Sequence, residues 1–136
     1  MKIAQETFAV STSRRCEMID ITSQVASVVS ASGIAAGTVT IFCPHTTAAI
    51  TINENADPDV PHDVLLTLTD LMPHSRDGYR HSEGNSDAHC KSSLVGASEL
   101  LLVHEGRLTL GTWQGIFFCE FDGARNRKVI VQVRGQ

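Results

Sequence analysis

Aromatic residues are scarce in this chain of 136 residues, which contains five Phe, one Tyr and one Trp. Its core must therefore rest on Val, Ile, Leu and Ala side chains. No apolar run approaches the ~20 residues that a membrane-spanning helix needs. The first residues, MKIAQETFAVSTS, lack the apolar stretch of a signal peptide. We expect a soluble, cytoplasmic protein that has no membrane partner.

A surplus of positive charge is also missing. The chain carries 11 Lys and Arg against 15 Asp and Glu, so its formal net charge is −4 at pH 7. Proteins that bind DNA or RNA by bulk electrostatics neutralise phosphates with Lys and Arg. We therefore expect no nucleic-acid partner, although a local pocket for an anion is compatible with this charge.

Several common catalytic motifs are absent. The sequence has neither the G-x-G-x-x-G fingerprint of dinucleotide-binding proteins nor the phosphate-binding loop G-x-x-x-x-G-K-[ST], and no serine lies in a G-x-S-x-G context. The four cysteines form no C-x-x-C pair, so zinc-finger spacing is missing too. We expect reduced, unpaired thiols at Cys16, Cys43, Cys90 and Cys119.

The length of the chain suits one domain that covers residues 1–136. Short alternating segments predict about eight strands, and turns such as Glu105-Gly106 and Asp122-Gly123 join neighbouring ones; the segment 107–112 is one of these strands. Hairpins of this kind favour antiparallel pairing. We predict an α+β fold with mostly antiparallel strands and two to three helices, in which two sheets can pack together.

Three helices are predicted. Residues 21–32 carry apolar side chains at helical spacing. Asp57, followed by Pro58, is typical of an N-cap and a first helical residue, so the second helix begins there and ends before Pro73. A short third helix extends to Val95.

The segment 73–87, between the second and third helices, contains almost no apolar side chain. It is rich in His, Arg, Glu, Asn and Asp. A segment of this composition is either a disordered linker or a long loop that forms the wall of a functional site.

Three histidines in polar segments are the first candidates for chemistry: His45, His81 and His89. Imidazole binds zinc and other transition metals, and three histidines leave a coordination position open for water or substrate. Their spacing matches no short metal-binding motif, so surface or capping histidines remain an alternative on the residues alone. Glu54 is a candidate general base, and Trp113 is expected to be buried beneath a loop or else to stack on a ligand.

Three longer segments resemble signatures of the YjbQ family. They read PHTTAAITINENADPDV, GYRHSEGNSDAHCKSSLVGAS and GRLTLGTWQGIFFCEFDGARNRKVIVQV, and together they cover about half of the chain. The resemblance implies a small α+β β-sandwich protein that assembles as a homotrimer. Members of the family are classed as secondary thiamine-phosphate synthases, which join hydroxymethylpyrimidine diphosphate to a thiazole phosphate and release pyrophosphate.

The resemblance also implies a histidine-rich site that holds a divalent metal and a small phosphorylated substrate. Its metal ligands are expected to be His45, His81 and His89. The catalytic residues carried over with the signatures are Glu54, Asn85, Asp87 and Arg125, with Trp113, Gln114, Glu120 and Asp122 as further signature residues. Asn85 or Asp87 would fix the orientation of a histidine ring, and Arg80 or Arg125 would bind phosphate oxygens.

Three hypotheses about function follow, and the identity of the metal distinguishes the first two. Enzymes acting on diphosphates usually hold Mg²⁺ with carboxylates, whereas a site of three histidines better suits Zn²⁺. A zinc-bound hydroxide with Glu54 as general base would suit a metal-dependent hydrolase instead of a synthase. A non-catalytic module that binds a metal or small ligand is the third possibility. We expect the three histidines to converge in one pocket, with Glu54, Asn85 and Asp87 within reach.

Overall fold

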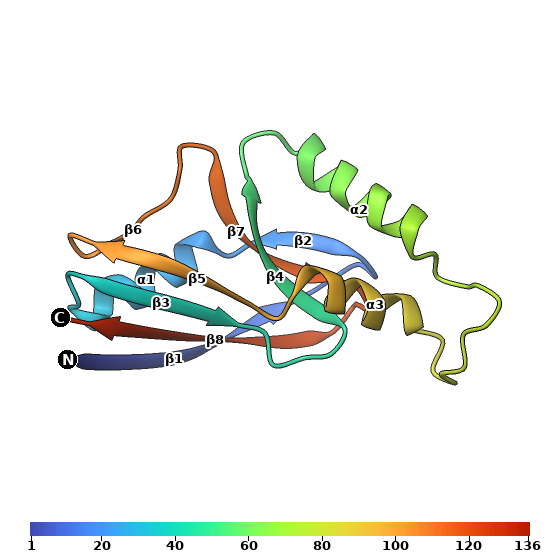
Figure 1. Ribbon diagram of the computed structural model, residues 1–136, viewed down its shortest axis with the longest axis horizontal. Helices are drawn as coiled ribbons and strands as arrows, with labels where there is room; N and C mark the ends of the chain where they lie inside the picture. The colour runs from blue at the N-terminus through green and yellow to red at the C-terminus, as the bar shows by residue number, and fades with distance from the viewer.

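The computed structural model describes residues 1–136, which form eight strands and three helices. Every strand pair is antiparallel, so the predicted α+β class is confirmed. The elements, shown in Figure 1, are β1 (Lys2–Ser11), β2 (Glu17–Asp20), α1 (Thr22–Ser32), β3 (Gly37–Phe42), β4 (Ala48–Glu54), α2 (Asp59–Leu71), α3 (Ser86–Val95), β5 (Ser98–His104), β6 (Arg107–Leu108), β7 (Gln114–Glu120) and β8 (Asn126–Gly135).

Two sheets pack around the main core. The larger sheet has the strand order β1-β8-β3-β5-β6 and the smaller one β2-β7-β4. Side chains alternate between the two faces of a strand, and on β8 the fully buried ones are Val129, Val131 and Val133. They pack with apolar side chains of β3, β4, β7 and α1. The smaller sheet and α1 therefore cover the same face of the larger sheet.

A second apolar cluster lies on the other face of the smaller sheet. Phe117 and Cys119 of β7 meet Leu68 of α2 and Ala88 of α3 there. Figure 1 shows α2 and α3 at the end of the molecule away from both chain termini. No helix combines the length and the hydropathy needed to cross a lipid bilayer.

The helix boundaries follow local signals closely. The first helix ends at Ser32, and Gly33 adopts a left-handed conformation with φ of 70°, which glycine tolerates without steric cost. The second helix begins at Asp59, slightly later than predicted, because Pro58 occupies the capping position. Asp57 still stabilises this end, since its Oδ1 accepts a hydrogen bond from the backbone N–H of Asp59 at 2.9 Å.

Two predictions about the segment before β7 are wrong. The strand expected over residues 107–112 is only two residues long, because the chain leaves the larger sheet after Leu108 to enter the smaller one. Trp113 is 62% exposed, since it lies in the turn that precedes β7 and not beneath a loop. Its side chain contributes nothing to the buried core.

The strand registers bring distant connections to one end of the molecule. Ala48 pairs with Glu120, so the connection 43–47 lies beside the connection 121–125. Phe42 pairs with Ile130, which places the start of β8 next to them. The N-terminus of α3 and the loop before it complete this end, and Figure 1 shows that loop farthest from the termini.

Candidate functional site

A polar cavity of about 420 Å³ opens where these connections meet. Sites for small molecules commonly have volumes of ~300–1,000 Å³. The lining is polar except for Pro44, whereas binding pockets are usually lined mostly by apolar side chains. The lining residues are Pro44, His45, Thr46, Thr47, His81, Glu83, Asn85, His89, Asp122, Arg125 and Arg127.

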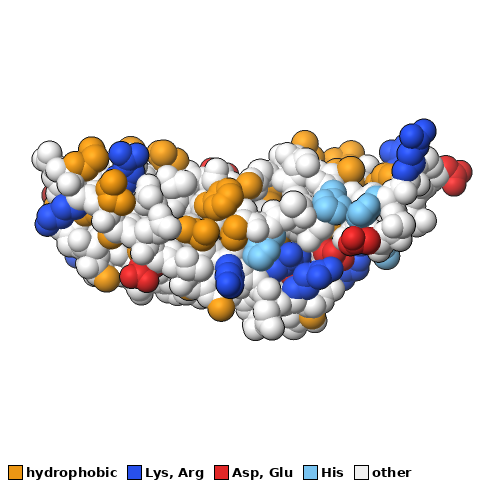
Figure 2. Space-filling view, turned by 90° about the horizontal axis from the view of Figure 1, so that it is seen from below, with side chains coloured by type: hydrophobic (Ala, Val, Ile, Leu, Met, Phe, Trp, Pro, Cys, Tyr) orange, Lys and Arg blue, Asp and Glu red, His pale blue; other side chains and the backbone are white.

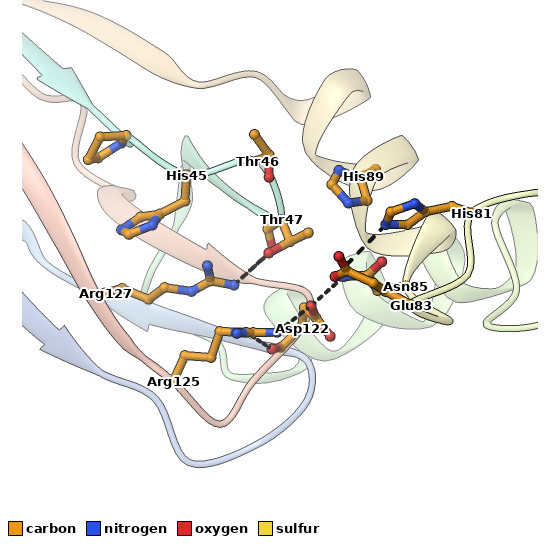
Figure 3. Close-up of a pocket in the computed structure, with 11 residues that line it drawn as sticks. His45, Thr46, Thr47, His81, Glu83, Asn85, His89, Asp122, Arg125 and Arg127 are labelled. Atoms are coloured by element: carbon orange, nitrogen blue, oxygen red, sulfur yellow. Dashed lines mark hydrogen bonds and ion pairs between the residues drawn. The ribbon is translucent and has the colours of Figure 1, made fainter.

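The structure brings all three candidate histidines to this cavity. His81 comes from the loop between α2 and α3, and His89 from the first turns of α3. Their ring centroids are 5.3 Å apart and the rings meet edge to face. In Figure 3, His45 lies across the cavity from this pair. Figure 2 shows histidines close to arginine and carboxylate side chains on one face of the molecule, with hydrophobic side chains beside them.

His45 is held in one protonation state by the backbone of β8. Its Nε2 accepts a hydrogen bond from the N–H of Lys128 at 2.9 Å. An accepting Nε2 places the ring proton of a neutral imidazole on Nδ1. Burial lowers the pKa of His45, and the positive charge of Arg127 lowers it further. His45 is therefore a neutral hydrogen-bond donor through Nδ1.

The expected site of three histidines around one metal does not fit this arrangement. The protein contains no group of three or more His, Cys, Asp or Glu side chains placed to hold a metal ion. A metal would need a free nitrogen lone pair on His45, and Lys128 already occupies the one on Nε2. His81 and His89 remain close to each other, but two ligands are fewer than the three or four of typical zinc sites.

Arg127 is a cavity residue that the sequence analysis missed. Its Nε and Nη2 donate to the fully buried carboxylate of Glu120, and Nη2 also donates to the hydroxyl of Thr47 at 2.9 Å. No protein group accepts a hydrogen bond from Nη1. One nitrogen of a rigidly held guanidinium is thus left for an anionic ligand.

A signal for Arg127 was present in the sequence. Alternation along β8 places it on the same face as Val129, Val131 and Val133, all of which are buried. A charged residue in a buried register needs a partner and often has a function. Glu120 is that partner. Burial opposes its ionisation, but the hydrogen bonds from Arg127, Asp122 and Thr12 prevail and lower the pKa of Glu120.

Arg125 and Asn85, both predicted site residues, do line the cavity and share one partner. Nη2 of Arg125 pairs with Oδ2 of Asp122 at 2.9 Å, and Nδ2 of Asn85 donates to the same oxygen at 2.8 Å. Burial raises the pKa of Asp122, but these two hydrogen bonds outweigh it and lower the pKa below its ordinary value. The carboxylate is therefore ionised and accepts from both.

Asp87 does not line the cavity, and the expected contact with a histidine ring is not formed. The carboxylate is fully buried, where it accepts two hydrogen bonds from Arg15 at 3.0 Å and one from Lys91 at 3.1 Å. Burial opposes ionisation, but these partners lower its pKa to about 2. Two residues along an α-helix correspond to about 200° of rotation, so Asp87 and His89 face nearly opposite sides of α3.

Glu54 lies at the far end of β4 and does not line the cavity either. The connection that carries His45 enters β4 at Ala48. A strand rises ~3.3 Å per residue, so the six steps from Ala48 to Glu54 cover about 20 Å. Within one chain, Glu54 is too far away to act as a base on a ligand beside His45.

Comparisons with known proteins place the chain in a family. The family model described as UPF0047 protein YjbQ-like matches residues 6–136. The UPF0047 protein YugU of Bacillus subtilis is 52% identical over 130 residues, which cover 96% of this chain and 98% of that protein. A UPF0047 protein of Methanocaldococcus jannaschii is 50% identical over 128 residues, 94% of this chain and 92% of that protein.

Solved structures show the same relationship. A protein of unknown function from Sulfolobus solfataricus superposes with a TM-score of 0.96 at 38% identity and covers 99% of both chains. An uncharacterised conserved protein of Clostridium acetobutylicum gives a TM-score of 0.93 at 51% identity, with 95% of this chain and 99% of that chain covered. The chain described here therefore belongs to the YjbQ-like UPF0047 family.

Proposed function

We propose that the cavity is the active site of a transferase for small phosphorylated substrates, with the activity of a thiamine-phosphate synthase. The observation that carries this proposal is the joint presence of three histidines and two arginines in one polar cavity. The resemblance of the chain to the YjbQ signatures supports the choice of reaction. The activity can be a secondary one, since the same groups would serve other diphosphate esters.

The donors of the cavity suit a diphosphate. Arg127 offers Nη1 from a guanidinium that Glu120 holds in place, and Arg125 offers a half-exposed guanidinium. Arginine binds phosphate oxygens through charge-assisted hydrogen bonds. Neutral His45 adds an N–H donor and Thr46 a hydroxyl. Together these donors suit an anionic group and offer no apolar contact surface.

The reaction needs stabilisation of a leaving group more than it needs a base. The lone pair of the thiazole nitrogen forms a bond to the methylene carbon of the pyrimidine. The bond from that carbon to the diphosphate oxygen breaks, and its electron pair leaves with pyrophosphate. Arg125 and Arg127 would stabilise the charge that develops on this oxygen, and the cavity would orient the two substrates.

A divalent ion is proposed as part of the substrate and not as a resident of the protein. Mg²⁺ is usually held by one or two carboxylates together with phosphate oxygens of the substrate. Glu83 and Asp122 are the carboxylates that line the cavity. The chain therefore supplies too few ligands for a metal of its own but enough to receive a magnesium diphosphate.

We also propose that the protein assembles as a homotrimer in the cytoplasm. The face of the larger sheet opposite the core carries exposed apolar side chains, including Phe42 of β3 and Leu100 and Leu102 of β5. Neighbouring exposed hydrophobic residues on a sheet favour a protein partner. Phe42 precedes the connection that carries His45, so such an interface would lie beside the cavity. The four free thiols support a reducing compartment.

A turnover assay tests the proposed activity. The purified protein is incubated with hydroxymethylpyrimidine diphosphate, thiazole phosphate and Mg²⁺, and both thiamine phosphate and pyrophosphate are measured. We expect the two products in equal amounts, and at least tenfold less of each with Arg125→Ala. Arg107→Ala, on β6 far from the cavity, is the matched control and should leave the rate unchanged.

The same assay separates the other hypotheses. Release of pyrophosphate with free hydroxymethylpyrimidine and no thiamine phosphate would identify a hydrolase. Tight binding of the diphosphate without any product would identify a ligand-binding module. Either result would contradict the proposed synthase.

A further inference from the structure

One buried acceptor in the cavity wall has no partner. Asn85 is only 5% exposed, and its Oδ1 is the single buried side-chain nitrogen or oxygen in the protein that makes no hydrogen bond. Buried polar groups are nearly always paired, because an unpaired one loses its bonds to water without replacement. Asn85 is one of the residues that line the cavity, so a ligand seated there is a candidate for the missing donor.

The position of Asn85 makes the missing bond more informative. Asn85 directly precedes α3, where asparagine commonly caps the helix with Oδ1. Here the side chain makes no capping hydrogen bond. It turns instead toward Asp122, to which Nδ2 donates at 2.8 Å, as Figure 3 shows. The amide is held for an interaction across the cavity wall and not for stability of the helix.

The ionised partner fixes which end of the amide is free. Asp122 pairs with Arg125 and accepts hydrogen bonds only, so the NH₂ group of Asn85 must face it. A flipped amide would set Oδ1 against a carboxylate oxygen. Oδ1 is consequently a fixed acceptor, and its complement is an N–H or O–H donor on the ligand.

We propose that Asn85 is a specificity-determining residue whose Oδ1 accepts a hydrogen bond from an amino group of the ligand. The cavity then recognises two features at once: an anionic group through Arg125 and Arg127, and an amino group through Asn85. This inference rests on the proposed function, whose pyrimidine diphosphate bears an amino group on the ring carbon next to the one that carries the methylene diphosphate. A site that hydrogen-bonds a ligand N–H rejects analogues lacking it, because its acceptor is left unpaired.

The test compares two ligands by calorimetry with the full chain: hydroxymethylpyrimidine diphosphate and its analogue with hydrogen in place of the amino group. We expect the analogue to bind at least about tenfold more weakly to the wild type. With Asn85→Leu the ratio of the two affinities should fall to about one, whatever the absolute affinities. Asn53→Leu, the same change at an exposed position of β4, should keep the wild-type ratio. Equal affinities in the wild type would overturn the inference.

A second variant covers the case in which Asn85→Leu fails to fold. Asp122→Asn removes the charge that orients the amide, so the ratio should drop there too. A ratio in this variant equal to that of the wild type would contradict the assigned orientation of Oδ1.

Further measurements separate this inference from the proposed reaction. Discrimination between the ligands without formation of thiamine phosphate would refute the reaction and keep the role of Asn85. If neither diphosphate binds, the probe is 4-amino-2-methylpyrimidine, followed by NMR at the side-chain amide of Asn85. A shift of this resonance that requires the amino group would support the inference, and no such shift would overturn it.

Discussion

Nε2 of His45 accepts a hydrogen bond from the backbone N–H of Lys128 at 2.9 Å, although the two residues are 83 positions apart in the chain. The bond ties the connection before β4 to the start of β8. It also decides the chemistry of the ring, because it leaves the proton on Nδ1 and occupies the lone pair of Nε2. His45 is therefore arranged to donate to a ligand and not to bind a metal.

His45 should remain neutral at pH 7. Burial and the charge of Arg127 hold its pKa below the ordinary 6.5. The folded state favours the neutral ring, so its contribution to stability is present above pH 6.5 and is lost as the pH falls through the folded pKa. A titration followed by ¹⁵N NMR should show a proton on Nδ1 at neutral pH and a midpoint below 6.5. A proton on Nε2 alone would contradict the assigned tautomer.

The buried carboxylate of Asp87 should be important for stability. Asp87→Ala leaves Lys91 as a buried cation without its partner, and we expect a loss of about 3–5 kcal/mol in the free energy of unfolding. Denaturation by urea measures this. Asp63→Ala, at an exposed hydrogen bond with His62, is the matched control and should cost less than about 1 kcal/mol. Similar losses in both variants would show that the Asp87 pair is not special.

The same carboxylate predicts a pH dependence. Because its pKa is lowered from 3.8 to about 2 in the folded protein, its contribution is complete above the ordinary value and is lost as the pH falls toward 2. The stability of Asp87→Asn should therefore decrease less with acidification than that of the wild type. Parallel acid-denaturation curves for the two proteins would argue against this origin of the shift.

Arg125 should contribute to anion binding without being needed for folding. Its side chain is half exposed, and Arg125→Ala should leave the melting temperature nearly unchanged. The affinity for inorganic pyrophosphate in the presence of Mg²⁺ should fall roughly tenfold, as is typical for one charge-assisted contact. Calorimetry measures this affinity, with Arg107→Ala as control. An unchanged affinity would remove Arg125 from the site.

Glu54 should be dispensable for turnover. It lies about 20 Å along β4 from the cavity, because an extended strand separates residues by ~3.3 Å each. Glu54→Gln should keep the rate of thiamine-phosphate formation within about twofold of the wild type, since surface changes rarely disturb a distant site. A large loss of rate with an intact fold would contradict this prediction. It would mean that Glu54 acts in the cavity of a neighbouring subunit.

The exposed face of the larger sheet should hold the proposed trimer together. Leu100 and Leu102 are 59% and 57% exposed on β5, and replacing both by Glu would place charges in an apolar interface. Light scattering should give about 44 kDa for the wild type, three times 14.7 kDa, and a monomer for the double variant. Leu66→Glu, an equally exposed position on α2, should leave the mass unchanged. A wild-type monomer at micromolar concentration would contradict the proposal.

The sequence alone determined the class of fold and most element limits, because apolar periodicity, turn residues and capping residues are signals carried by short stretches of the chain. Alternation on β8, the left-handed Gly33 and the Asp57-Pro58 helix start are local signals that do not depend on tertiary packing. The candidate histidines were also identified from sequence, with the help of the family resemblance. The sequence shows that these residues are histidines in polar segments. Whether they come together in one cavity depends on how the strands pair.

Only the tertiary structure decided which residues line the cavity and what each one can do. Arg15 neutralises Asp87 from 72 positions away, and this buried pair removes Asp87 from the site. Glu120 fixes Arg127 because β7 and β8, which follow each other in the chain but belong to different sheets, turn both side chains toward the buried interior. Extension of β4 carries Glu54 out of reach. The physical reason is the same in each case. Burial and strand register determine which partner a charged group has, and local sequence patterns do not contain this information. The partner in turn determines the charge, the orientation and the function of the group.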